Sequence, residues 1–173
     1  MIPASQLQRA LEIVKPAVSG KCSLPIISSV LIEQNGHLTL TATDLDLWVR
    51  TWVDVEGEDF SAIVEPKRLL DIVKGGGGDV RLWSLSSQCL NIETGSQETN
   101  VATHHHSSEF PAWTDESPTN SQEVETKGFL KSIEKAVKSA STDERRYGLD
   151  GVFFEGKTSQ LVAMDGHKLS QTP

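Results

Sequence analysis

The residues best suited to chemistry lie in the segment MDGHKL, which runs from Met164 to Leu169. A carboxylate near an imidazole can exchange protons, so Asp165 and His167 could serve as an acid–base pair. The segment follows an apolar run, and Asp-Gly supplies the kind of turn that ends a strand. Because no nucleophile or metal cluster accompanies the pair, we interpret the segment as a binding turn just past a strand end.

Three other groups resemble chemical sites but lack an essential part. Asp44 and Asp46 lie two residues apart, again without a supporting nucleophile or metal cluster. The three histidines at 104–106 could suggest a metal site, but successive residues of an extended segment point to alternate sides. The glycines at 75–78 lack the Lys-Ser/Thr of a phosphate-binding loop. The sequence therefore predicts no catalytic residue, no metal and no cofactor.

The composition bounds the class of protein. A chain of 173 residues allows one domain, or one and a part, and its net charge is −8. That acidic average argues against a nucleic-acid binder, although a basic patch can be local. No apolar run is long enough to span a membrane, and the N-terminus lacks a secretory signal. We expect a cytoplasmic protein in which Cys22 and Cys89 are reduced thiols.

Apolar residues at helical spacing predict three amphipathic helices. The first spans residues 4–18, with Ser5 as its N-cap and Pro16 at its end. The second opens at Pro66 and runs to residue 74, where the glycines at 75–78 stop it. The third spans residues 126–140. Its expected buried side consists of Phe129, Ile133, Ala136, Val137 and Ala140.

Strands follow each predicted helix. Their expected ranges are 24–33, 38–43, 47–55, 61–64, 79–85, 89–94, 99–103, 151–154 and 161–164. Asn35-Gly36 predicts a tight hairpin turn between the first two. Asp44 in residues 38–47 matches Asp165 in residues 160–169, and Ala42 matches Ala163, which indicates a repeated unit of helix, strand, hairpin, strand and Asp turn. Residues 110–122, rich in Pro, Ser, Thr and acids, are predicted to form an interdomain linker.

The side of the third helix opposite its apolar face carries a row of lysines. These are Lys127, Lys131, Lys135 and Lys138. Such a row is commonly a solvated face. Most of the sixteen basic residues, however, lie on the three helices or just after them, while the acids crowd the strands, turns and linker. An acidic protein with basic helices can present one basic surface to a phosphate backbone.

Taken together, six segments resemble the bacterial sliding clamp, the beta subunit of DNA polymerase III. They are SLPIISSVLIE (23–33), LTLTATDLDLWVR (38–50), VEPKRLLDIVKG (64–75), EFPAW (109–113), ERRYGLDGVFFE (144–155) and LVAMDGHKLS (161–170). The resemblance implies an α+β DNA-clamp fold: repeated strand-helix-strand units, with helices on one face of antiparallel sheets. It also implies a non-catalytic ring that encircles duplex DNA and tethers the polymerase.

The resemblance implies two sets of site residues. Its DNA-binding positions, together with two lysines of the row, are Lys21, Lys74, Lys127, Lys131, Arg145, Arg146 and Tyr147. One wall of its pocket for short peptides matches Arg146, Leu149, Met164, Gly166, His167, Lys168 and Leu169. The implied partners are duplex DNA, bound without sequence preference, DNA polymerase III, the clamp loader and other proteins with clamp-binding motifs.

The chain also departs from the family pattern. Family clamps have three domains and form oligomeric rings. Here residues 1–116 correspond to the N-terminal domain, and residues 117–173 to the first half of the middle domain. Gly148 replaces an aromatic residue, and Asp143 a neutral polar one, which weakens the DNA role of that loop. The alternative function is therefore a short clamp-like module that binds peptides, or acts as a decoy, without encircling DNA.

Overall fold

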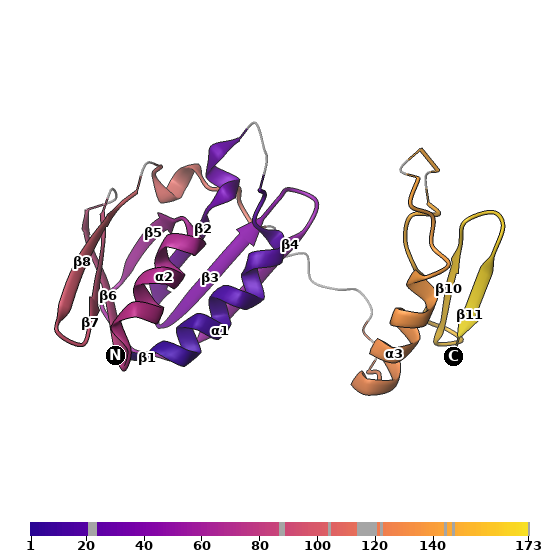
Figure 1. Cartoon of the computed structure of the whole chain (residues 1–173), viewed down its shortest axis with the longest axis horizontal. Coiled ribbons are helices and arrows are strands. Elements are labelled where there is room, and N and C mark those ends of the chain that lie inside the picture. Colours follow the sequence, from indigo (N-terminus) through magenta and orange to yellow (C-terminus); the bar gives the residue numbers. More distant parts are fainter. Residues whose placement is uncertain are drawn as a thin grey trace. The chain divides into compact units, whose positions relative to one another are not determined.

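The computed structural model describes residues 1–20, 24–86, 89–103, 105–113, 121, 123–143, 145–146 and 148–172. The chain divides into two compact units, Met1–Thr114 (unit 1) and Asp115–Pro173 (unit 2), both drawn in Figure 1. The domain boundary expected after residue 116 falls outside the described residues. Within the described residues, no helix is both long and apolar enough to cross a membrane.

Unit 1 contains two four-stranded antiparallel sheets. The first has the order β4-β3-β2-β5 and consists of β2 (Val30–Asn35), β3 (His37–Thr43), β4 (Trp48–Val53) and β5 (Phe60–Val64). The second has the order β1-β6-β7-β8 and consists of β1 (Ile2–Pro3), β6 (Asp79–Ser86), β7 (Cys89–Thr94) and β8 (Gln97–Ala102).

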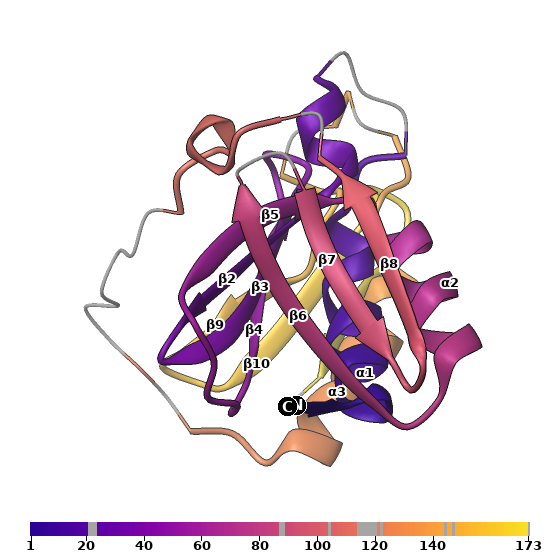
Figure 2. The same cartoon turned by 90° about the vertical axis from the view of Figure 1, so that its left-hand side faces the viewer.

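Two helices, α1 (Ala4–Val14) and α2 (Pro66–Gly76), lie side by side on one face of these sheets (Figures 1 and 2). Each buries the apolar stripe that its sequence period predicted. Leu7 and Leu11 of α1 and Leu69 of α2 are all within 2% of complete burial. They join Leu40 and Leu90 from the two sheets in one core. The predicted α+β fold, with helices on one face of antiparallel sheets, is confirmed.

The ends of these helices differ from the prediction. Ser5 is not the N-cap, because α1 already begins at Ala4, after Pro3, and has no side-chain cap. The α-helix ends at Val14, and a 3-10 turn, Lys15–Ala17, holds Pro16, which cannot continue an α-helix. Conversely, α2 continues through Gly76 instead of ending at residue 74. Gly77, with a φ of 63°, then ends it.

The outer face of the first sheet is covered by segments that the sequence placed elsewhere. The strand expected from residue 24 is instead a 3-10 helix, Pro25–Ser28, and β2 begins only at Val30. Phe110, placed in the linker, is 6% exposed in a cluster with residues of this face such as Leu31. Trp113 meets Trp48 edge-on at 5.7 Å. The linker prediction is therefore wrong for its first residues, and residues 114–120 and 122 lie outside the described part.

Unit 2 contains α3 (Thr126–Val137) and a three-stranded antiparallel sheet in the order β11-β10-β9. Its strands are β9 (Phe153–Glu155), β10 (Gln160–Met164) and β11 (Leu169–Thr172), of which β11 was not predicted. Glu125 caps α3 by accepting hydrogen bonds from the amides of Lys127 and Gly128. The helix buries Ala136 against Leu161 and Ala163. Val137, expected on the buried side, is 53% exposed.

The hairpin and following strand of unit 1 recur in unit 2 in the same register. Ile32 pairs with Leu40 on the helix side of the first sheet, and Phe154 pairs with Leu161 on the helix side of the third. On the opposite side, Phe153 therefore corresponds to Leu31, and Leu169 to Trp48. Leu31 and Trp48 lie under Phe110, whereas Phe153 is 66% and Leu169 is 61% exposed.

Candidate functional site

The turn between β10 and β11 is built around the carboxylate of Asp165. Its Oδ1 accepts hydrogen bonds from the backbone amides of His167 and Lys168, both at 2.9 Å. Its Oδ2 lies 3.2 Å from Nζ of Lys168. The hydrogen bonds that the backbone amides of Lys168 and His167 donate are the main reason that the pKa of Asp165 falls from 3.8 to about 2. The carboxylate is therefore charged at neutral pH and anchors the turn.

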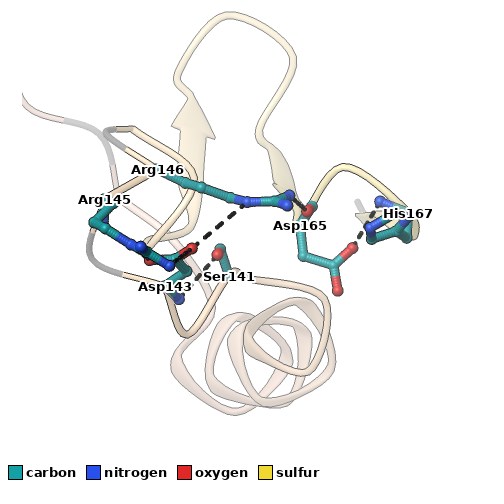
Figure 3. Close-up of polar contacts among 6 residues, drawn as sticks. All are labelled: Ser141, Asp143, Arg145, Arg146, Asp165 and His167. Carbon is teal, nitrogen blue, oxygen red and sulfur yellow. Dashed lines mark hydrogen bonds and ion pairs between the residues drawn. The ribbon is translucent and has the colours of Figure 1, made fainter.

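Two cations connect this turn to the rest of unit 2. Lys168 Nζ donates a hydrogen bond to the carbonyl of Lys138, just after α3, at 2.7 Å. Arg146, in the loop that follows α3, donates from Nη1 to the carbonyl of Asp165, as Figure 3 shows. A cation at a helix C-terminus meets carbonyls that have no partner in the helix. The turn, the loop and the end of α3 are thus joined by side chains.

The same loop holds a second anchored carboxylate, Asp143. Arg145 contacts both its oxygens, at 3.0 and 3.3 Å, and this side-chain hydrogen bonding is the main reason that the pKa of Asp143 is lowered. Arg146 Nε approaches it at 4.0 Å. The hydroxyl of Ser141 accepts a hydrogen bond from the backbone amide of Asp143, at 3.1 Å (Figure 3). Asp143, which the sequence suggested would weaken DNA contact, is therefore paired with both arginines.

Gly166 fits this turn for two reasons. Its φ of 90° is a conformation that residues with a side chain rarely adopt. A Cβ at this position would also lie 2.8 Å from Nη1 of Arg146. In unit 1 the corresponding residue is Leu45, which adopts a φ of 83° in a turn around Asp44. Gly166 therefore leaves room for the guanidinium of Arg146.

The residues expected to form the peptide pocket separate into a polar and an apolar group. Arg146, His167 and Lys168 line a shallow hollow of about 220 Å³ between the loop and the turn. Met164 and Leu169 instead pair with each other directly beside the turn and are 36% and 61% exposed. The remaining two, Leu149 and Gly166, lie in the loop and at the turn.

The residues expected to bind DNA are mostly exposed. Lys74 lies in the last turn of α2, and Lys127 and Lys131 lie on α3 with Lys135, all exposed. Arg145 is also exposed, with 90% of its side chain open to solvent. Lys21 and Tyr147 lie outside the described residues.

Other groups considered in the sequence have structural roles or remain separate. Asp44 accepts the amides of Asp46 and Leu47, so it anchors a turn as Asp165 does. His105 pairs with Glu109 at 3.4 Å, and His104 is not described. Over the residues that the structure describes, no three histidine, cysteine or acidic side chains are grouped to hold a metal ion.

Sequence reasoning missed the partners that organise the site. The sequence predicts no role for Ser141 or for the carbonyl of Lys138, and the family pattern for the pocket does not include Asp165. An Asp followed by Gly just past a strand was the available signal for the turn. The contact between Lys168 and Lys138 spans 30 positions and leaves no local pattern.

Comparison with known proteins identifies one family throughout. The model of the DNA polymerase III beta subunit, N-terminal domain, matches residues 1–113. The beta sliding clamp of Vibrio cholerae is 32% identical over 178 residues, which cover 98% of this chain and 48% of that relative. The DNA polymerase III subunit beta of Pseudomonas aeruginosa has a TM-score of 0.87 at 26% identity, over 98% of this chain and 47% of that structure.

A second solved structure, the beta subunit from Thermotoga maritima, has a TM-score of 0.82 at 28% identity, over 98% of this chain and 47% of its own. The similarity therefore includes both units. The chain spans about half the length of the curated relatives it matches.

Proposed function

We propose a function for this chain from the premise that it belongs to the DNA polymerase III beta subunit family, the beta sliding clamps. The function is sequence-independent contact with duplex DNA, as part of a clamp that tethers the polymerase. Unit 1 corresponds to the N-terminal domain, and unit 2 to the first half of the middle domain. Ring formation, and partnership with DNA polymerase III and the clamp loader, belong to this proposal because the chain spans about half of its relatives.

The exposed basic side chains on the helices are the observation that carries the DNA-binding proposal. Lys127, Lys131, Lys135 and Lys138 are all exposed, on α3 or just after it, while Ile133 and Ala136 on its other side face the sheet. At 1.5 Å per residue, this row extends over about 17 Å. A stripe of cations suits phosphates, which offer charge but no sequence information.

Unit 1 repeats this distribution of charge. Arg9 on α1, Lys15 directly after it, and Lys67, Arg68 and Lys74 on α2 are exposed. The apolar sides of the two helices are buried on the sheets. The basic residues on the helices of each unit thus support contact with DNA, despite the chain's net charge of −8.

The test is the salt dependence of duplex binding. Each phosphate neutralised contributes about −0.9 to the slope of log K against log salt, so the four lysines of the row on α3 and just after it should supply up to about −3.6. Lys131→Gln should weaken binding and make the slope less steep by about 0.9. Lys157→Gln, an exposed lysine in the β9–β10 turn, is the matched control and should change neither quantity. The proposal is refuted if duplex affinity does not change with salt concentration, or if Lys157→Gln weakens binding as much as Lys131→Gln does.

Peptide binding is the second candidate function, and the wall in unit 2 favours it. A polar hollow between the loop and the turn is lined by Arg146, His167 and Lys168, and the apolar pair Met164 and Leu169 is exposed where β10 and β11 meet that turn. Polar groups beside apolar surface suit a short peptide with aliphatic or aromatic anchors. Titration of a fluorescein-labelled peptide that carries leucine and phenylalanine anchors tests this function, and no saturable binding to the chain would exclude it.

A further inference from the structure

We propose that Asp165 is the positioning residue of the peptide-binding wall. Arg146 and Lys168 hold the wall together through contacts within the protein, and His167 is the polar group that contacts the peptide. This inference rests on the second candidate function above, and it divides the wall's polar residues into two roles. The division follows from where each side chain already makes its contacts.

Asp165 acts at the centre of three segments. Its carboxylate holds the amides of His167 and Lys168, and therefore fixes the backbone from which both side chains project. Its carbonyl oxygen accepts Arg146 from the loop after α3. Asp165 also lines the hollow, but only 20% of its side chain is exposed, so it offers a peptide little surface. Asp165 therefore acts on a ligand through its neighbours.

Lys168 and Arg146 engage their charged groups in contacts within the protein, although 58% and 43% of their side chains are exposed. The ammonium of Lys168 lies between the Asp165 carboxylate, at 3.2 Å, and the Lys138 carbonyl, at 2.7 Å. The guanidinium of Arg146 lies against Asp165 and extends its Nε towards Asp143. A peptide that recruited either cation would have to break these contacts. Both residues are better suited to hold the wall than to bind the ligand.

His167 differs from its two neighbours. Its backbone amide is held by Asp165, but its side chain is exposed and lines the hollow. In Figure 3 the imidazole extends from the turn on the side away from Arg146. A neutral imidazole offers one donor and one acceptor, which matches a peptide amide. His167 thus provides an accessible polar group at a fixed position.

Unit 1 contains a version of the turn without these additions. Asp44 Oδ1 accepts the amides of Asp46 and Leu47 at 3.1 and 2.7 Å, as Asp165 does for the residues at the same spacing. Leu47 occupies the position of Lys168 and has no charge to bind a helix end. The turn geometry is therefore common to both units, and Asp44 provides a matched control for Asp165.

The experiment combines amide hydrogen exchange with titration of the labelled leucine–phenylalanine peptide, both on the whole chain. Asp165→Ala should speed exchange at His167 and Lys168 about tenfold or more, and weaken peptide binding. Asp165→Asn keeps an oxygen for the amides but loses the charge beside Lys168, so its effect should be intermediate. Asp44→Ala should speed exchange at Asp46 and Leu47 but leave peptide affinity unchanged.

A double-mutant cycle separates positioning from general stability. His167→Ala should weaken the peptide without changing exchange in the turn. In the Asp165→Ala background it should cost far less, because His167 is no longer held in place. An undiminished cost of His167→Ala in that background overturns the proposal. So does a Lys168→Gln variant that loses affinity while its turn stays protected, because Lys168 would then contact the peptide directly.

The two levels of inference fail in different ways. If the unmodified chain binds no peptide, the peptide-binding function and the role of His167 are both wrong. Exchange in Asp165→Ala still decides whether Asp165 anchors the turn. If the peptide binds but Asp165→Ala behaves as the unmodified chain does, the function stands and the positioning role is wrong.

Discussion

Replacing Gly76 by alanine should destabilise unit 1, although alanine is the better helix former. A Cβ on this last residue of α2 would lie 2.1 Å from both Cβ and Oγ1 of Thr94. Thr94 is 3% exposed on β7, between partners on β6 and β8, and its Cβ is fixed to the backbone. The helix end or the strand must therefore move.

The size of the effect is the difference between two terms. Forced overpacking costs about 1–3 kcal/mol, and we take the upper end because the colliding atom is a Cβ. The helical preference of alanine over glycine returns about 0.8 kcal/mol. Gly76→Ala should therefore lower the free energy of unfolding by about 2 kcal/mol. Thr94→Ser should not rescue it, because the Cβ remains.

Gly75→Ala is the matched control within the same helix. No atom lies within 4 Å of a Cβ at Gly75, so this variant should gain about 0.5–1 kcal/mol. Urea unfolding followed by tryptophan emission measures both variants, since Trp48, Trp52, Trp83 and Trp113 all lie in unit 1. Equal losses in the two variants, or a Gly76→Ala variant as stable as the parent, would refute the packing argument.

Three further outcomes are expected. Leu161→Ala should destabilise unit 2 by about 2–4 kcal/mol, because Leu161 is 2% exposed between α3 and the sheet; amide exchange in unit 2 should rise while tryptophan emission stays constant. Arg50→Gln should cost about 1 kcal/mol and shift tryptophan emission, because the guanidinium lies 4.4 Å from the Trp113 ring centroid. Because the pKa of Asp165 is depressed to about 2, its contribution to stability should be complete above pH 4 and fade as the pH falls through about 2; NMR shifts of the His167 amide should follow this titration, and Asp165→Asn should abolish it.

The sequence was most informative where one local period decided the structure. The stripes of α1, α2 and α3 identified three helices, and the aligned Asp turns identified the repeat. It misplaced residues whose environment comes from distant segments. Phe110 looks like linker by composition, yet it is buried beside Leu31 and Ile63. Val137 fits the helical stripe, but it is 53% exposed.

For the candidate site, residue types were predictable and partners were not. His167 and Lys168 stood out beside an Asp-Gly turn. Nothing local indicated that Lys168 reaches the end of α3, or that Arg146 reaches the carbonyl of Asp165. Such contacts depend on how a helix and a hairpin pack, which a period in the sequence does not specify.

The uncovered face of the unit 2 sheet affects how the protein will behave as ionic strength changes. Phe153 and Leu169 are open to water, whereas their counterparts in unit 1 are covered by Phe110. The net charge of −8 keeps molecules apart, but salt screens that repulsion beyond about 8 Å at physiological ionic strength. Apolar attraction at Phe153 and Leu169 survives the same salt. Buffers of high ionic strength, which weaken contacts between basic residues and phosphates, will therefore favour self-association of the chain through the exposed face of the unit 2 sheet.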